Sequence, residues 1–454
     1  MSSVVDVLAL VLVFSLPKAG LLVGGVPVTF ASMVMAGHGA WRWVMPGAQG
    51  APVHLARSFV QRHLVFAWAV TVVLLVQLTD SGVEDLVTWA LLIGSPIAFH
   101  AGLHVRRTGA VMAAILVAAV LVGGYAVVQN VVGVEEASVE GITFVAGTDL
   151  VEDNPIRTPS GTLKSPSTFH NGNLAASFLL LAIGVAAVAS VVERRLRGLA
   201  LLAVAVSVAG IAVSLSRSAV LALVLALFIA LAPRHRPEWL GRRAASLVAV
   251  ALLFAGSLVA GYVLFGAENF LVDRFVGDSV EDPTAAGRTD GAGQWWDDLR
   301  IEDSGGLLEA LLVGNTEVSL DDQVEGIVFI VGRYGLLVAA AFVIMAVGPM
   351  REWRRRLGRA STVAWLGPAA LSIMWLVDST FLFPPTLLNW AFVCGLITRL
   401  VNQPSLWGVV RVVEPPSVVI DRHSASDRDK GGVVDDASTV PGLDAGSSRT
   451  EVLT

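Results

Sequence analysis

A succession of long apolar stretches is the feature that most constrains how this chain can fold. A helix of about 20 residues crosses the hydrocarbon core of a bilayer, and a window of that length detects twelve such stretches in the sequence. They lie near 4–20, 24–41, 63–79, 85–104, 109–130, 171–192, 198–214, 218–233, 244–265, 324–347, 362–378 and 383–401. A mean hydropathy of +0.71 with only 15% charged residues excludes a soluble domain of this length. We therefore expect an all-α polytopic membrane protein with about twelve transmembrane helices.

Arginine and lysine are divided unequally between alternate loops. One set of five short loops carries 17 arginines, which are Arg42, Arg57, Arg62, Arg106, Arg107, Arg194, Arg195, Arg197, Arg234, Arg236, Arg242, Arg243, Arg351, Arg354, Arg355, Arg356 and Arg359. The other set is longer in total and holds only Lys18, Arg157, Lys164, Arg217, Arg274, Arg288 and Arg300. Positive charge is retained on the cytoplasmic side of a membrane. The pattern therefore predicts that both termini are cytoplasmic.

The domain organisation follows from these spans. Residues 1–403 form the predicted transmembrane domain, and two outer loops, about 131–170 and 266–323, are long enough to build a site. The second loop lies between the ninth and tenth spans and carries 14 acidic residues against three arginines. Residues 404–454 are rich in Ser, Asp, Gly and Val without helical periodicity, so we expect a disordered cytoplasmic tail.

Arg217 lies in the segment SLSRSAV, residues 214–220, where one apolar span ends and the next begins on the predicted outer face. An ionisable side chain at the edge of hydrocarbon is costly without an anionic partner or water, and such residues mark functional sites. The alternative is an arginine that extends to the lipid headgroups and simply anchors the end of a span. Composition alone leaves both readings open.

Three stretches resemble the O-antigen ligase and O-antigen polymerase superfamily of bacterial membrane glycosyltransferases. GTLKSPSTFHNGNLAASFLLL at 161–181 resembles the loop that leads into a span, and SLSRSAVLALVLAL at 214–227 resembles a Ser-Arg pair before a span of small residues. GRTDGAGQWWDDL at 287–299, followed by LLVGNTEVSLDDQVEGIVFIVGRYGLL at 311–337, resembles the late outer loop. Each motif is weak by itself, and their order and shared location carry the resemblance.

The resemblance implies a GT-C-like fold in the bacterial cytoplasmic membrane and a glycan donor linked to undecaprenyl pyrophosphate. Arg217 and Arg288 match the two arginines that bind pyrophosphate in that family. A guanidinium suits this role because it stays charged and can bind two phosphate oxygens at once. The alternative for Arg288 is a surface ion pair with a nearby carboxylate, and for Arg157 and Lys164 ordinary solvation competes with binding of phosphate or sugar.

The acceptor hydroxyl would need a general base. Ligases of the family present a histidine after the large loop, whereas this chain has Asp321 and Asp322 there, as polymerases often do. We therefore take Asp322 as the candidate base and Asp321 as the second candidate. Acidic residues are also expected at the start of any outer helix, where they interact favourably with the helix dipole. His170 is the third candidate because, of eight histidines, it alone falls in a predicted outer loop.

Further residues are expected to contact the substrate. Asn171 and Asn173 lie at a span entrance beside His170, where helix capping or packing would explain them equally well. Trp295 belongs to the late outer loop. Arg333 lies about nine residues inside the predicted tenth span, where a lone charge is costly. Either that span begins later than placed, or Arg333 has a carboxylate partner or faces the active cavity.

The resemblance thus implies a glycosyltransferase that polymerises surface polysaccharide repeat units and uses no metal, cofactor or nucleic acid. Its partners would be an undecaprenyl-pyrophosphate-linked oligosaccharide, a glycan acceptor, membrane lipids and envelope assembly proteins. The alternatives are a ligase for finished glycans, a transporter or flippase, and a non-enzymatic partner of an envelope complex. A carrier would show related halves and polar residues near mid-membrane, which this sequence lacks. The single cysteine, Cys394, offers neither a disulfide nor a cysteine metal site.

Overall fold

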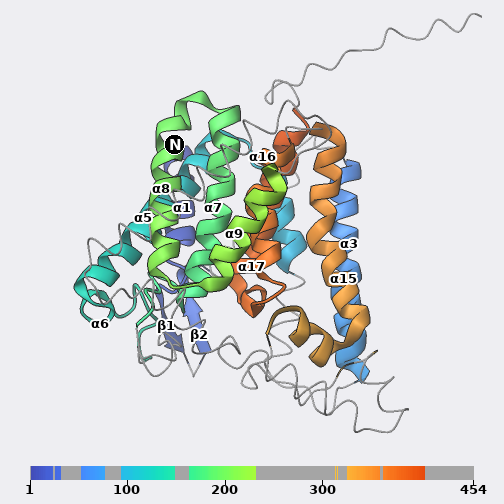
Figure 1. Cartoon of the computed structure of the whole chain (residues 1–454), viewed down its shortest axis with the longest axis horizontal. Helices are drawn as coiled ribbons and strands as arrows, with labels where there is room; N and C mark the ends of the chain where they lie inside the picture. Colours follow the sequence, from blue (N-terminus) through green and yellow to red (C-terminus); the bar gives the residue numbers. More distant parts are fainter. Residues whose placement is uncertain are drawn as a thin grey trace, which may run out of the picture. The chain divides into compact units, whose positions relative to one another are not determined.

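The computed structural model of the chain describes residues 2–23, 26–31, 53–76, 94–148, 163–231, 312, 314, 325–357 and 361–403 (Figure 1). All of them belong to the unit formed by residues 1–410. The predicted tail 404–454, the ninth span near 244–265 and nearly all of the loop 266–323 lie outside the described residues.

Helices dominate the described part of the chain. The α-helices are α1 (Ser2–Ser15), α3 (Val53–Val76), α5 (Thr108–Val132), α6 (Val134–Ala137), α7 (Gly172–Val192), α8 (Arg197–Val213), α9 (Arg217–Leu231), α15 (Gly326–Leu357), α16 (Ser361–Met374) and α17 (Pro384–Val401). Residues 94–103 are also helical. Two 3-10 helices, η1 (Arg194–Leu196) and η6 (Ser379–Leu382), connect longer helices. The expectation of a mostly helical protein is confirmed.

Five helical segments in the described part are long and apolar enough to cross a membrane. They are Arg57–Val76, Thr108–Val132, Gly172–Val192, Arg194–Val213 and Gly326–Leu357. Shorter apolar helices cover Arg217–Phe228, Val363–Met374 and Pro385–Val401. These eight segments overlap eight of the expected spans, so the protein is a membrane protein with several spanning helices. The total of twelve stays a prediction.

The expected second span, 24–41, is wrong at its start. Strand β2 (Val26–Thr29) pairs antiparallel with β1 (Gly20–Val23), and Leu22 stands opposite Pro27 in this pair. Proline lacks an amide hydrogen and does not fit a helix interior, whereas the valines around it favour extended backbone. The hairpin is joined to the loop after α6, because Gly20 donates to the carbonyl of Gly141 at 3.2 Å.

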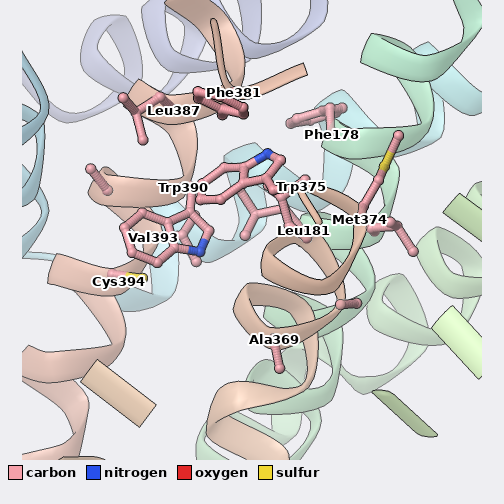
Figure 2. Packing of buried hydrophobic residues seen from close by; sticks show 14 of the residues in the cluster. Phe178, Leu181, Ala369, Met374, Trp375, Phe381, Leu387, Trp390, Val393 and Cys394 are labelled. Carbon is pink, nitrogen blue, oxygen red and sulfur yellow. The ribbon is translucent and has the colours of Figure 1, made fainter. Parts of the chain in front are cut away.

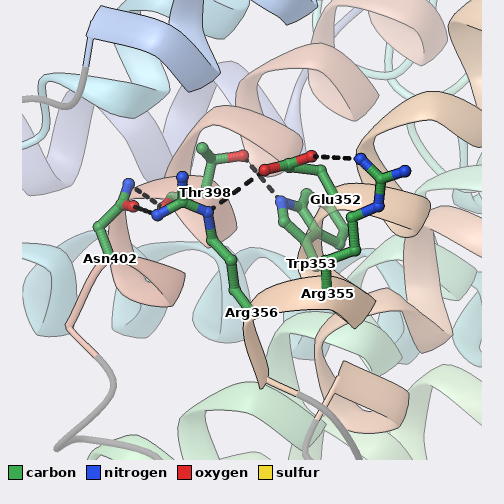
Figure 3. Close-up of polar contacts among 6 residues, drawn as sticks. All are labelled: Glu352, Trp353, Arg355, Arg356, Thr398 and Asn402. Carbon is green, nitrogen blue, oxygen red and sulfur yellow. Dashed lines mark hydrogen bonds and ion pairs between the residues drawn. The ribbon is translucent and has the colours of Figure 1, made fainter. Parts of the chain in front are cut away.

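Contacts between the ends of helices define one end of the bundle, which we call the arginine-rich end (Figure 3). Arg356, on the last turn of α15, donates to the Asn402 side chain after α17 at 3.1 Å, and to Glu352 at 3.4 Å. The Trp353 indole donates to Thr398 of α17 at 3.0 Å. The last turn of α15, with its predicted cytoplasmic Arg356, therefore lies beside the last turn of α17.

Other contacts define the opposite end. Thr168, before α7, donates to the carbonyl of Ser15, the last residue of α1. The amide of Ser167 donates to Gln129, near the end of α5, at 2.6 Å. Because α7 starts here and its last turn leads into Arg194 and Arg195, the described helices alternate in direction as the loop charges predict. The face of the membrane that each end occupies stays a prediction.

Helix α7 is central to the bundle, because it packs against α5, α8, α9, α16 and α17. It approaches α16 closely, because a Cβ on Gly184 would lie only 2.4 Å from the Cα of Gly367. Small residues allow membrane helices to approach this closely, and dispersion contacts then stabilise the pair. Beside this crossing, Trp375 and Trp390 pack with ring centroids 5.2 Å apart (Figure 2).

Helix α15 is divided by a kink at Gly335, whose φ of 82° and ψ of 171° are not helical. Residues 326–334 form a separate first segment, drawn in brown in Figure 1, before the long apolar helix. Arg333 lies on this first segment, and Gly314 packs against its backbone carbonyl. The predicted start at 324 lies within two residues of the start of α15, and Arg333 precedes the kink that begins its long apolar part.

Candidate functional site

The entrance to α7 brings several of the predicted residues to the end opposite the arginines. Asn171 is the N-cap of α7, and its side chain accepts from the Leu174 amide at 2.9 Å. His170 is half-buried, and its ring stacks on Phe383 with centroids 5.8 Å apart. Asn171 thus caps α7, and His170 packs on Phe383.

Arg217 is the first residue of α9 and follows a tight turn from α8. Leu215 in that turn has a φ of 55°, a conformation that a leucine rarely adopts. Ser216 accepts from the amide of Ala219 at 3.3 Å, as an N-cap serine does. Arg217 itself is half-buried, at the start of an apolar helix.

The turn before α9 touches the entrance to α7. A Cβ on Gly172 would lie 2.3 Å from the carbonyl oxygen of Ser214 and 3.4 Å from the Cβ of Lys164. The amide of Ser165 also donates to the Val213 carbonyl at 3.4 Å. The segment that carries Lys164, His170 and Asn171 therefore meets the turn before Arg217, which lies about fifty residues later in the sequence.

A buried carboxylate joins these segments to the connection between α16 and α17. Asp378 is only 3% exposed. One oxygen, Oδ2, accepts from the Asn173 amide group at 2.7 Å and from the Ser218 hydroxyl at 3.0 Å. The other, Oδ1, accepts from the Thr380 amide at 3.2 Å. These donors satisfy a charge whose burial would otherwise be costly.

We call Asn173, Ser216, Ser218 and Asp378 the Asp378 cluster. Its members come from the start of α7, the start of α9 and the N-cap of η6. The same connection also holds α15, because the Gly326 amide donates to Ser379 at 2.8 Å. Four chain segments are therefore tied together at one end of the bundle, and charged and polar groups gather there at the edge of an apolar core.

Sequence reasoning did not select Asp378, although the sequence contains a signal for it. Asp378 is the only charged residue between Arg359 and Arg399, in a stretch that holds two predicted spans. The argument that singled out Arg217 applies equally here, because an ionisable residue beside hydrocarbon marks a functional position. The prediction sought the site mainly in the two long outer loops, whereas Asp378 lies in a short connection between two spans.

The structure brings together Lys164, His170, Asn171, Asn173 and Arg217. Arg333 lies on the first segment of α15, whose start contacts Ser379. The other predicted site residues, Arg157, Arg288, Trp295, Asp321 and Asp322, lie outside the described residues. Among the described residues, no three His, Cys, Asp or Glu side chains are grouped as a metal site requires.

Comparison with known proteins does not assign the chain to a family. No protein-family model and no curated protein matches this chain.

Proposed function

We propose that this protein transfers a glycan from undecaprenyl pyrophosphate to the hydroxyl of an acceptor sugar at the outer face of a bacterial cytoplasmic membrane, and that it polymerises polysaccharide repeat units. The observation that carries the proposal is the position of Arg217. This cation opens an apolar helix, is half-buried, and is flanked by two serines of the Asp378 cluster. That location suits the anionic group of a lipid that lies in the membrane.

In the proposed reaction the main requirement is to stabilise the negative charge that develops on the departing pyrophosphate. The acceptor oxygen attacks the anomeric carbon, the bond from that carbon to the pyrophosphate oxygen breaks, and undecaprenyl pyrophosphate leaves with the bonding electrons. Arg217 would stabilise the departing charge, together with Arg288 of the late outer loop. The hydroxyl proton would pass to a base, for which Asp322, Asp321 and His170 are the candidates.

The test is a reconstituted assay with the purified protein and an undecaprenyl-pyrophosphate-linked oligosaccharide, with products read on a gel. A ladder of longer lipid-linked chains supports a polymerase. A single shift that requires a separate acceptor supports a ligase, and absence of turnover with substrates of the native pathway favours a carrier or an assembly partner.

Variants make the assay specific for the site. Arg217→Ala is expected to lower the transfer rate about 100-fold or more, as removal of a group that stabilises developing charge does, and Arg217→Lys should rescue poorly because a point charge cannot bind two oxygens at once. Arg195→Ala is the matched control, because this arginine is exposed at the arginine-rich end. Full activity of Arg217→Ala would remove Arg217 from the mechanism.

A further inference from the structure

We propose that Asn173 accepts a hydrogen bond from a hydroxyl of the glycan through its Oδ1 atom, and that Asp378 is the positioning residue that turns Asn173 into this orientation. The inference rests on the proposed function, since it names the part of the donor that the Asp378 cluster recognises. It concerns the sugar attached directly to the pyrophosphate, because Asn173 and the residue after Arg217 bind the same oxygen of Asp378.

The orientation of Asn173 follows from the chemistry of its partner. A carboxylate can only accept hydrogen bonds, so the amide must point its NH₂ group at Oδ2, 2.7 Å away. Its carbonyl oxygen, Oδ1, is then directed away from Asp378. Within the described part of the chain no group donates to Oδ1, and Asn173 is only partly buried. An acceptor is thus presented at the site, and sugar hydroxyls are donors that fit it.

The same carboxylate sets the direction of a chain of hydroxyl groups beside Arg217. Ser218 has one proton and gives it to Asp378 at 3.0 Å. Ser216 lies 3.2 Å from Ser218, so it must be the donor in that pair, and it accepts in turn from the amide of Ala219. Every proton in this chain points toward Asp378. An amide at position 378 could donate as well as accept, so it would no longer fix the direction of these hydrogen bonds. The Asn173 amide could then flip and exchange the positions of its NH₂ group and its oxygen.

The experiment measures binding to the purified protein in lipid nanodiscs with two probes. One is undecaprenyl pyrophosphate, and the other is undecaprenyl pyrophosphate carrying the oligosaccharide extracted from cells that make the protein. The wild type is expected to bind the glycan-bearing probe more tightly. Asn173→Ala and Asp378→Asn should each reduce this preference about tenfold, the loss of one hydrogen bond, while affinity for the bare lipid changes little.

Ser379→Ala is the matched control. Its hydroxyl bonds the Gly326 amide from the same connection but does not touch the Asp378 cluster. It should lower the melting temperature and leave the preference for the glycan unchanged. Asn173→Ser, which also lacks the Oδ1 acceptor but keeps a polar residue at this position, replaces the alanine variant if that variant does not fold.

The outcomes separate this inference from the proposed function. Folded variants at positions 173 and 378 that keep the full preference would overturn the role of Asn173. A wild type that prefers the glycan, with variants that lose the preference, but that transfers no sugar, would overturn the proposed function and leave the recognition of the glycan standing. A wild type that binds neither probe would overturn both.

Discussion

The crossing of α7 and α16 allows a quantitative prediction for Gly184→Ala. The new Cβ would lie 2.4 Å from the Cα and the nitrogen of Gly367, whereas ordinary contact begins at 3.4 Å. The two helices must therefore separate by about 1 Å. Overpacking of this kind costs about 1–3 kcal/mol. The crossing also links α7, which carries Asn173, to the helix that leads to Asp378, and a misplacement of about 1 Å can lower a catalysed rate about 100-fold.

The free energy of unfolding would be measured by titration with sodium dodecyl sulfate, and transfer by the reconstituted assay. Gly198→Ala is the control, because no atom lies within 4 Å of the Cβ it would add. We expect that variant to keep or slightly raise the stability of the wild type, since alanine favours a helix over glycine. If Gly184→Ala were as stable and active as Gly198→Ala, the helices would not be in the close contact described above.

Three further predictions concern single side chains. Gln129→Leu removes the two hydrogen bonds of the Gln129 side chain to the Ser167 amide and carbonyl, at 2.6 and 3.1 Å. Because these groups are buried, the free energy of unfolding should fall by about 1–3 kcal/mol in the same titration. An unchanged midpoint would contradict this. Trp353→Phe loses the indole bond to Thr398 at 3.0 Å and should cost about 1 kcal/mol, less than Gln129→Leu. Asp322→Asn should slow glycan transfer if this residue is the base, and a normal rate would exclude it.

The spans were predictable wherever hydrophobicity alone decides the structure. The expected segments 109–130 and 171–192 correspond to α5 (Thr108–Val132) and α7 (Gly172–Val192) within two residues at each end. A bilayer requires long apolar helices, so a simple window finds them. The same window failed at 24–41, because it scores the valines of β2 as it would score a helix and ignores what Pro27 does to the backbone.

The candidate site was predictable only in part. Arg217 and the Asn171–Asn173 pair were selected because they are polar residues at span boundaries, and the structure shows them at the same end of the bundle. Asp378 was missed because its importance depends on partners in α7 and α9, which are 205 and 160 residues away in sequence, respectively. No local pattern reports contacts over such distances.

The sequence by itself determined that this is a helical membrane protein, and its loop charges predicted the alternating direction that the described helices show. Both properties follow from the transfer of each segment between water and lipid, a quantity that depends on that segment alone. Only the tertiary structure decided that Gly335 divides α15, that Gly184 meets Gly367, and that Asp378 is buried against Asn173 and Ser218. Those features depend on which helices pack together, because a buried carboxylate is stable only where the fold supplies its donors.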